Sequence, residues 1–348
     1  MKTLFYKLFA VSVLLGSLVG GWLWMDADRF LDTPINVQEQ PYYYEIKHGE
    51  TLKQLTNNLY LAGIISNPRY LVWYGRLTRS ASKIQVGEYA FKEGMTPRDI
   101  LQDITSGKTV QYSFTLIEGW NFRELIQELN RCQDLVHTVN DLSPKQIMEK
   151  LGYPGQHPEG RFLPDTYYFP RGTTDVEFLK RAYTAMESFL DFEWQNRQPG
   201  LPYKDAYEAL TMASIVEKET GLASERPAIA GVFVRRIQKR MRLQTDPTVI
   251  YGLGAKFDGN LRRRDLVNDT PYNTYRHNGL PPTPIAMPGK DSIRAALHPD
   301  DGDALYFVAR GDGSHEFTSN LKDHNQAVVK YQLKGKARPF SSMPRVAR

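Results

Sequence analysis

Residues 8–25 form a run without a charged side chain, preceded by Lys7 and followed by Asp26. An α-helix rises about 1.5 Å per residue, so these eighteen residues come close to the ~30 Å hydrocarbon core of a bilayer. The apolar region of a cleaved signal peptide is usually shorter, about 7–15 residues. Trp22 and Trp24 lie at the far end of the run, where interfacial aromatic residues are common. We therefore expect a transmembrane anchor, with a cleaved signal peptide as the alternative.

The charges around this run predict its orientation. Lys2 and Lys7 stand on the short leading side, which predicts a cytoplasmic N-terminus over residues 1–7 and a chain that continues outside the cytoplasm. The sequence has a single cysteine, Cys132, so an intramolecular disulfide is excluded. Because no cysteine stands directly after the run, a bacterial lipoprotein anchor is excluded as well.

Length and charge set only broad limits. A chain of 348 residues is long enough for two or three domains with sizeable cores. The formal net charge of +5 favours anionic partners such as phospholipid headgroups or cell-wall carboxylates, but it is too small to identify one. We expect no nucleic-acid partner.

Residues 26–40 are predicted to be a linker, and residues 41–110 a small module of strands and short helices. The module should contain strands at Tyr42–Ile46 and Gly87–Phe91 and helices that begin at Thr51, Asn67 and Thr96, the last ending before Gly107. The first strand, the His48–Thr51 turn and the following helix resemble a LysM-type glycan-binding module. This resemblance implies a surface that holds a glycan strand.

Residues 111–348 are predicted to form a larger mixed domain. The pattern predicts a strand within residues 110–120 and helices at 122–129, 175–192 and 203–220, with Asn121 and Ser224 as helix caps. Beyond Gln244 the chain should be rich in turns until a strand near Ala304–Ala309. The expected class is α+β: a transmembrane helix, a LysM-like module and a helix-rich catalytic domain.

Two carboxylates close the helix that ends before Gly221. Glu217 and Glu219 are two residues apart, so they point in nearly opposite directions and cannot both face one cleft. A glutamate at such a position can have its pKa raised by desolvation and act as a general acid near neutral pH. Periodicity does not choose between the two, and both could simply be solvated at a helix end.

Several longer motifs bear on the choice between Glu217 and Glu219. They are Glu159–Thr166, Ile215–Thr220, Leu243–Gly252, Tyr272–Tyr275, Gly279–Ile285 and Pro288–Gly289. In this order, together with the N-terminal anchor and the LysM-like module, they resemble the YceG-like, or MltG, family of endolytic peptidoglycan (murein) transglycosylases. The resemblance extends from the anchor to Asn325. It implies that Glu219 is the catalytic glutamate.

The resemblance also implies a reaction. Most glycosidases use two carboxylates, whereas a lytic transglycosylase needs only one, which protonates the glycosidic oxygen and then assists attack by the sugar's own C6 hydroxyl. The product ends in 1,6-anhydro-N-acetylmuramic acid. Candidate substrate-binding residues beside the catalytic glutamate are Glu217, Gln244, Thr245, Asp246, Tyr251, Tyr272 and Asn273. Their alternative role is to build turns, for which Asp246-Pro247 and Asn273-Thr274 are well suited.

No metal or cofactor is expected, because the gaps between His298, His315 and His324 match no common ligand spacing. The expected partners are peptidoglycan glycan strands, inner-membrane lipid and peptidoglycan synthases, with the catalytic domain in the periplasm. A function in terminating nascent strands follows from the same resemblance. Two rival functions remain: a module that binds glycan without cutting it, and a hydrolytic muramidase that uses Glu217 or Asp246 as a second carboxylate.

Overall fold

The computed structural model describes residues 2–38 and 40–333 and divides into two compact units. The first unit comprises Met1–Tyr112 with Tyr168–Gly172, and the second Ser113–Tyr167 with Thr173–Arg348. Residues 1, 39 and 334–348 had been assigned to the cytoplasmic N-terminus, the linker and the end of the catalytic domain. They lie outside the described residues.

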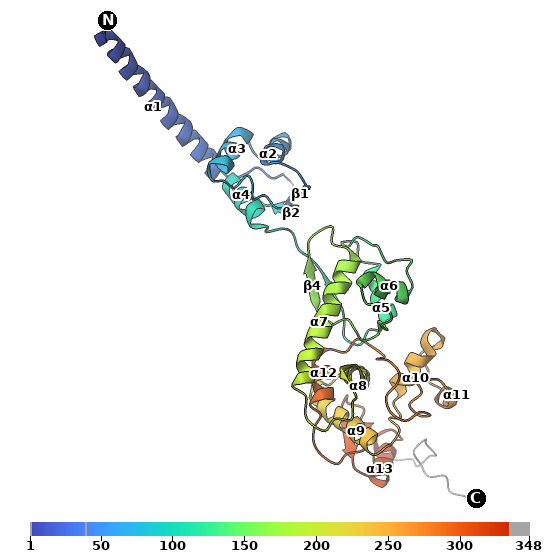
Figure 1. The fold of residues 1–348 in the computed structure, drawn as a ribbon. Coiled ribbons are helices and arrows are strands. Elements are labelled where there is room, and N and C mark those ends of the chain that lie inside the picture. The colour runs from blue at the N-terminus through green and yellow to red at the C-terminus, as the bar shows by residue number, and fades with distance from the viewer. Residues whose placement is uncertain (1, 39, 334–348) are drawn as a thin grey trace, which may run out of the picture. The chain divides into compact units, whose positions relative to one another are not determined.

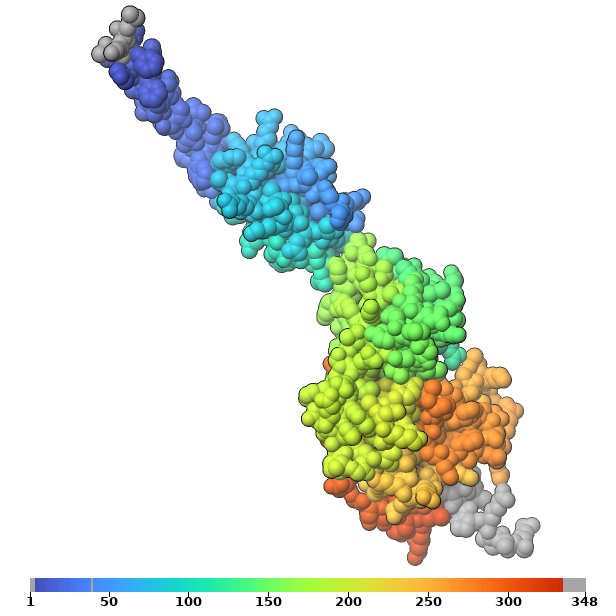
Figure 2. Space-filling model, viewed as in Figure 1, coloured from blue at the N-terminus to red at the C-terminus, as the bar shows by residue number. Residues whose placement is uncertain are grey.

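The first unit begins with α1 (Lys2–Asp32), a continuous helix of 31 residues. Its part from Leu4 to Asp32 is long and apolar enough to cross a membrane, and Figure 2 shows the first part of this helix uncovered by the rest of its unit. Residues 26–32, in the first part of the expected linker over 26–40, continue the helix. Phe30 and Leu31 are buried in the core of the unit, which explains why the chain is ordered there.

The rest of the first unit is a small module with one antiparallel strand pair and three helices (Figure 1). Strands β1 (Tyr42–Ile46) and β2 (Gly87–Phe91) are antiparallel, with Tyr42 opposite Phe91 and Ile46 opposite Gly87. Between them lie α2 (Leu52–Leu61) and α3 (Pro68–Leu77), and α4 (Pro97–Ser106) follows. Thr51, Asn67 and Thr96 cap these helices as predicted, and α4 ends at Gly107 in a left-handed conformation that favours glycine.

The second unit is rich in helices. They are α5 (Phe122–Leu129), α6 (Pro144–Leu151), α7 (Asp175–Gln195), α8 (Ala206–Glu219), α9 (Arg226–Gln238), α10 (Asp246–Leu253), α11 (Arg263–Val267), α12 (Lys290–Leu297) and α13 (Leu321–Tyr331). Single 3₁₀ turns occupy Ala223–Glu225 and Gly254–Lys256. Its strands β5 (Tyr306–Ala309) and β6 (His315–Thr318) pair with each other. Strands β3 (Tyr112–Thr115) and β4 (Thr166–Phe169) form another pair, and each has residues in both units.

Helix α8 lies at the centre of this unit. It packs against α7, α9, α10 and α12, and Figure 1 shows these helices grouped around it. Every residue from Ala209 to Val216 is buried, so the middle of the helix is enclosed on all sides. The core of the unit therefore fixes the position of the helix's last turn.

Three sequence predictions for this part differ from the structure. The strand expected within 110–120 is only four residues long, at Tyr112–Thr115. Ser224 does not cap a helix but lies inside a 3₁₀ turn, and α9 begins two residues later without a side-chain cap. The region beyond Gln244 contains helices α10, α11 and α12 where a turn-rich stretch had been expected.

Candidate active site

The last residue of α8 is Glu219. Asp205 starts the helix by accepting a hydrogen bond from the backbone N–H of Glu208, and Thr220 ends it in an extended conformation. Glu219 is partly exposed at the end of an otherwise buried helix. The packing of α8 in the core thus places the carboxylate of Glu219 at the partly exposed end of the helix.

The carboxylate of Glu219 has a protonation behaviour suited to acid catalysis. Its pKa is raised to about 7, mainly by burial and to a smaller extent by the negative charge of Asp246. The Thr245 hydroxyl, which donates a hydrogen bond to this carboxylate, lowers the pKa, as do His315 and Arg236. A carboxyl group with such a pKa is partly protonated at neutral pH, so it can both give and take a proton.

Thr245 is held in place by two other threonines. Its backbone N–H donates to the hydroxyl of Thr274 (3.1 Å), and its carbonyl accepts from the hydroxyl of Thr248 (2.8 Å). The hydroxyls of Thr248 and Thr274 lie 2.9 Å apart. The preceding residue, Gln244, is exposed and has a φ of 54°, which is unusual for a residue other than glycine. The donor to Glu219 therefore stands on a rigid backbone.

Asp246, Tyr275 and Arg236 complete the surroundings of Glu219. The Tyr275 hydroxyl donates to the exposed carboxylate of Asp246 over 2.6 Å. The buried guanidinium of Arg236 donates to the carbonyls of Leu305 (2.7 Å) and Leu243 (2.6 Å). These contacts fix one negative and one positive group within electrostatic range of Glu219.

Glu217 faces the other way, as the helix geometry requires. Its carboxylate accepts from the Ser292 hydroxyl (2.6 Å) and from the backbone N–H of Gly289 (3.0 Å), and Arg226 lies at 3.5 Å. Gly289 precedes the first turn of α12, where a negative charge is favourable. With its side chain only 6% exposed, Glu217 joins α8 to α12 and α9.

A third glutamate, Glu159, was missed as a functional residue by the sequence reasoning. It is 3% exposed, and burial raises its pKa to about 7. Its carboxylate accepts from the backbone N–H of Phe122 (2.9 Å) and from the Tyr251 hydroxyl (2.9 Å). The sequence signals were its place in the Glu159–Thr166 motif and in a Gly/Pro-rich segment, and neither indicated that its side chain is buried.

Tyr251 links this buried carboxylate to an open cavity of about 540 Å³. The cavity is lined by residues that include Tyr251, Ile250 and Pro247 of α10 and Lys218 of α8. Tyr251 packs edge-on against Tyr272 at 4.9 Å between ring centres, and the Tyr272 hydroxyl lies 2.9 Å from that of Thr283. The cavity thus begins beside the residue that precedes Glu219.

Asn273 organises the loop rather than presenting its amide to solvent. It is fully buried, and its amide nitrogen lies 2.6 Å from the carbonyl of Asn268 and 3.1 Å from that of Leu266. Its amide oxygen accepts from the backbone N–H of Tyr275 (3.0 Å). Within residues 2–38 and 40–333, no three His, Cys, Asp or Glu side chains lie close enough together to hold a metal ion.

Comparisons with known proteins agree on one family. The model of the YceG-like family matches residues 44–330. The chain is 33% identical to the endolytic murein transglycosylase of Bacillus subtilis (strain 168), over 82% of this chain and 83% of that one. The chain belongs to the YceG-like family.

Two further relatives also match most of this chain. An endolytic murein transglycosylase of Streptococcus pneumoniae is 25% identical over 86% of this chain, which spans 60% of that longer protein. A crystal structure of a YceG-like protein from Listeria monocytogenes has a TM-score of 0.53 and 28% identity, covering 82% of this chain and 98% of that one. The YceG-like match includes every candidate site residue named above.

Proposed function

We propose that this chain is an endolytic murein transglycosylase in which Glu219 is the single catalytic acid and base. Relatives of this name match most of the chain. The observation that carries the proposal is the partly exposed Glu219 carboxyl, whose pKa burial raises to about 7, at the end of a buried helix. Membership of the YceG-like family supports the same function.

In the proposed reaction, protonated Glu219 gives its proton to the oxygen between N-acetylmuramic acid and N-acetylglucosamine as the C1–O bond breaks. The resulting carboxylate takes the proton of the C6 hydroxyl of the muramic acid, whose oxygen bonds to C1. The strand end becomes a 1,6-anhydro ring, Glu219 regains its proton, and no water is consumed. Thr245 and Arg236 stabilise the carboxylate form between the two proton transfers, because both lower its pKa.

The candidate substrate contacts fall into two groups. Gln244 and Asp246 are exposed on either side of Thr245, so they are placed to hydrogen-bond a sugar bound at Glu219. Tyr251 lines the cavity beside α8 and offers an aromatic face for a sugar ring. For Glu217, Tyr272 and Asn273, whose polar atoms are engaged inside the unit, we propose support of the cleft walls rather than contact with the glycan.

The first unit would hold the enzyme at the membrane. In this proposal α1 spans the inner membrane with the N-terminus in the cytoplasm, and the catalytic unit lies in the periplasm. The order strand, helix, helix, strand in residues 42–91, with the two strands paired, supports a LysM-like module that grips the glycan. Cleavage close to the membrane would act on newly made strands, which makes peptidoglycan synthases the proposed partners.

The test is mass spectrometry of purified peptidoglycan digested with the native chain and with Glu219→Gln. We expect internal fragments with anhydro ends from the native chain alone. Fragments from both proteins would assign the catalytic function to another residue. Peptidoglycan left intact by both would favour a glycan-binding protein instead.

One observation favours a hydrolytic muramidase as a second candidate. Asp246 is exposed and close enough for its charge to raise the pKa of Glu219, so it could activate a water molecule. The hydrogen bonds already accepted by Glu217 make that residue a poor second carboxylate. Hydrolysis would give reducing ends instead of anhydro ends, and Asp246→Asn would abolish it.

A further inference from the structure

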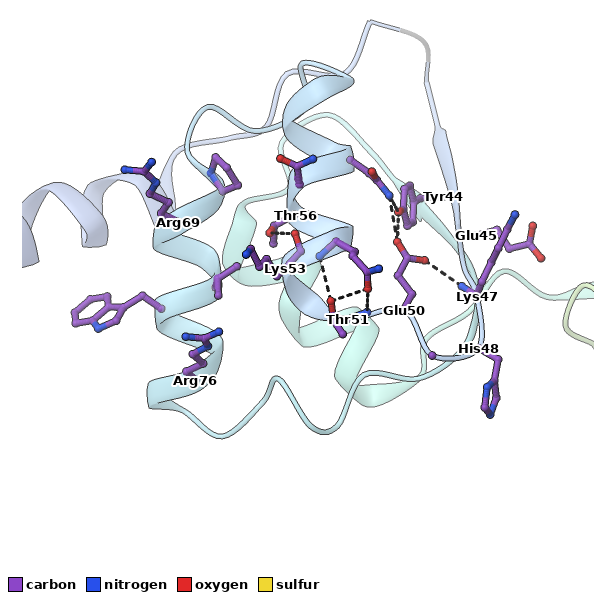
Figure 3. A pocket seen from close by; sticks show the side chains of 17 residues that line it. Tyr44, Glu45, Lys47, His48, Glu50, Thr51, Lys53, Thr56, Arg69 and Arg76 are labelled. Atoms are coloured by element: carbon purple, nitrogen blue, oxygen red, sulfur yellow. Dashed lines mark hydrogen bonds between the residues drawn. The ribbon is translucent and has the colours of Figure 1, made fainter.

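Helix α3 presents an exposed basic and aromatic face. Arg69, Trp73 and Arg76 are spaced by four and three residues, so they lie on one side of the helix. Trp73 is 45% exposed, a large fraction for an indole, and both arginines are exposed. Neither arginine forms an ion pair with any described part of the chain. Figure 3 shows Arg69 and Arg76 projecting from the same helix.

This face lies next to the end of the apolar run in α1. The ring of Trp73 packs edge-on against that of Trp24, with 5.7 Å between the ring centres. Two residues further along α1, Asp26 accepts a hydrogen bond from Tyr70 of α3 over 2.7 Å. If α1 spans a bilayer, Trp24 lies at the level of the headgroups, and Trp73 must lie at the same level.

The neighbouring groove adds positive charge on the same side. The α3 residues Arg69, Trp73 and Arg76 line an open groove of about 1550 Å³. Lys53 of α2 lines it as well. Figure 3 shows Lys53 between α2 and α3, whereas Glu50 and Tyr44 lie on the other side of α2. Glu50 is also occupied there, because it accepts from the hydroxyl of Tyr44 and from the backbone N–H of Lys47. The α3 side therefore keeps a cationic surface.

We infer that Arg69, Trp73 and Arg76 dock the first unit on the anionic phospholipid headgroups of the bilayer that α1 enters. The chemistry fits this one partner: tryptophan prefers the interface between water and lipid, and arginine heads pair with lipid phosphates. The inference rests on the proposed membrane-spanning function of α1. It adds a second attachment, which holds the module against the bilayer surface instead of leaving it free above the membrane.

The experiment uses the full chain in lipid nanodiscs, in a Cys132→Ser background with one introduced cysteine that carries a fluorophore. Leu77→Cys labels the edge of the α3 face, where Leu77 is 57% exposed. His48→Cys is the matched control, because Figure 3 shows His48 on the side of the module away from α1. Leu15→Cys reports insertion of α1 itself. The quenchers are lipids with a nitroxide on the headgroup or bromine on the acyl chain.

In discs containing phosphatidylglycerol, we expect the headgroup nitroxide to quench the label at residue 77 strongly and the label at residue 48 weakly. The pair Arg69→Gln and Arg76→Gln should weaken headgroup association about 25-fold, at about five-fold per cation. Quenching at residue 77 should then fall clearly, although the contact of Trp73 with Trp24 should keep it above the level at residue 48. The pair Arg69→Lys and Arg76→Lys should retain quenching, because the attraction depends on charge.

The outcomes separate the two proposals. Quenching of Leu15→Cys by brominated lipid without quenching at residue 77 would keep the anchor and overturn the docking face. Equal quenching at residue 77 in phosphatidylcholine alone, or in the glutamine pair, would overturn recognition of anionic headgroups. Absence of quenching at residue 15 would refute the membrane-spanning function of α1 and the docking inference with it, whereas cleavage of soluble glycan would still report on Glu219.

Discussion

Glu217 and Glu219 are two residues apart on α8, yet the two sides of the helix treat them differently. On the Glu217 side, a hydroxyl, a backbone N–H and a guanidinium surround a buried carboxylate. On the Glu219 side, the Thr245 hydroxyl is the one hydrogen-bond donor described at the carboxylate, and the site is partly open. The same chemical group therefore connects helices on one face and carries a labile proton on the other.

The difference shows how a protein assigns functions to similar residues. A carboxylate that accepts several hydrogen bonds is stabilised as an anion and becomes part of the scaffold. A desolvated carboxyl with few donors holds its proton to higher pH, which is the requirement for a general acid. Residue type and helix position alone do not distinguish the two, because the donors come from other elements of the fold.

The largest expected effect is that of Glu219→Gln. We expect cleavage to fall by at least about a thousand-fold, because in the proposed mechanism Glu219 alone supplies the proton. The variant should also lose less stability than the native chain when the pH rises from acidic to neutral. The native chain holds this proton more tightly than the unfolded chain does, so it loses stability as the pH rises from 4.5 to about 7, and Gln removes that loss. Initial rates and thermal unfolding across this pH range test both parts.

The next largest effect should be on stability, from Glu217→Gln. Removing a buried charge that faces Arg226 and the start of α12 should lower the free energy of unfolding by about 3 kcal/mol. Ser292→Ala, which removes one donor, should cost only about 1 kcal/mol. Denaturant unfolding measures both. A folded Glu217→Gln protein of unchanged stability but without activity would reverse the functions assigned to the two glutamates.

A smaller effect should follow from Glu159→Gln, which weakens the anchor of Tyr251. We expect kcat/KM to fall about ten-fold, because Tyr251 is no longer held in one position beside the cavity. Tyr251→Phe should have a similar effect, and the double variant should be little worse than either single variant. The rate of the native chain should decline as the pH rises through about 7, because Glu219 loses its proton. This decline should remain in all three variants. Its disappearance in Glu159→Gln would make Glu159 the titrating acid.

The smallest effect should come from Thr245→Val. Without the hydroxyl, the carboxylate form of Glu219 loses a hydrogen bond, so its pKa should rise by about one unit. The alkaline decline of the rate should therefore move to higher pH by the same amount. Thr245→Ser keeps the hydroxyl and should restore the native profile. An unchanged profile in Thr245→Val would show that this hydrogen bond does not control Glu219.

Local features of the fold could be read from the sequence. Thr51, Thr96 and Asn121 cap helices through bonds to residues three positions later, so the signal lies within one short segment. Helices α10 and α12 were missed for a related reason. Asp246-Pro247 and Pro288-Gly289 are typical of turns and of helix starts alike, and the helices that follow are only eight residues long.

The candidate site was less accessible to such reasoning. Resemblance, and not periodicity, singled out Glu219. The contacts that define the site join distant parts of the chain: Thr245 and Glu219 are 26 residues apart, and Tyr251 and Glu159 are 92 residues apart. Only tertiary packing brings such pairs together, so neither the buried state of Glu159 nor the engaged amide of Asn273 has a signature in the sequence.

The left-handed backbone of Gln244 sets a limit on engineering this protein. In this left-handed conformation, steric strain from the Cβ atom costs about 1–2 kcal/mol, and glycine avoids this strain because it has no Cβ. Gln244→Gly should therefore raise the stability of the folded state. The side chain that it removes is exposed next to Thr245. Under the proposed function, the same change would remove a side chain that is placed to hydrogen-bond the sugar bound at Glu219.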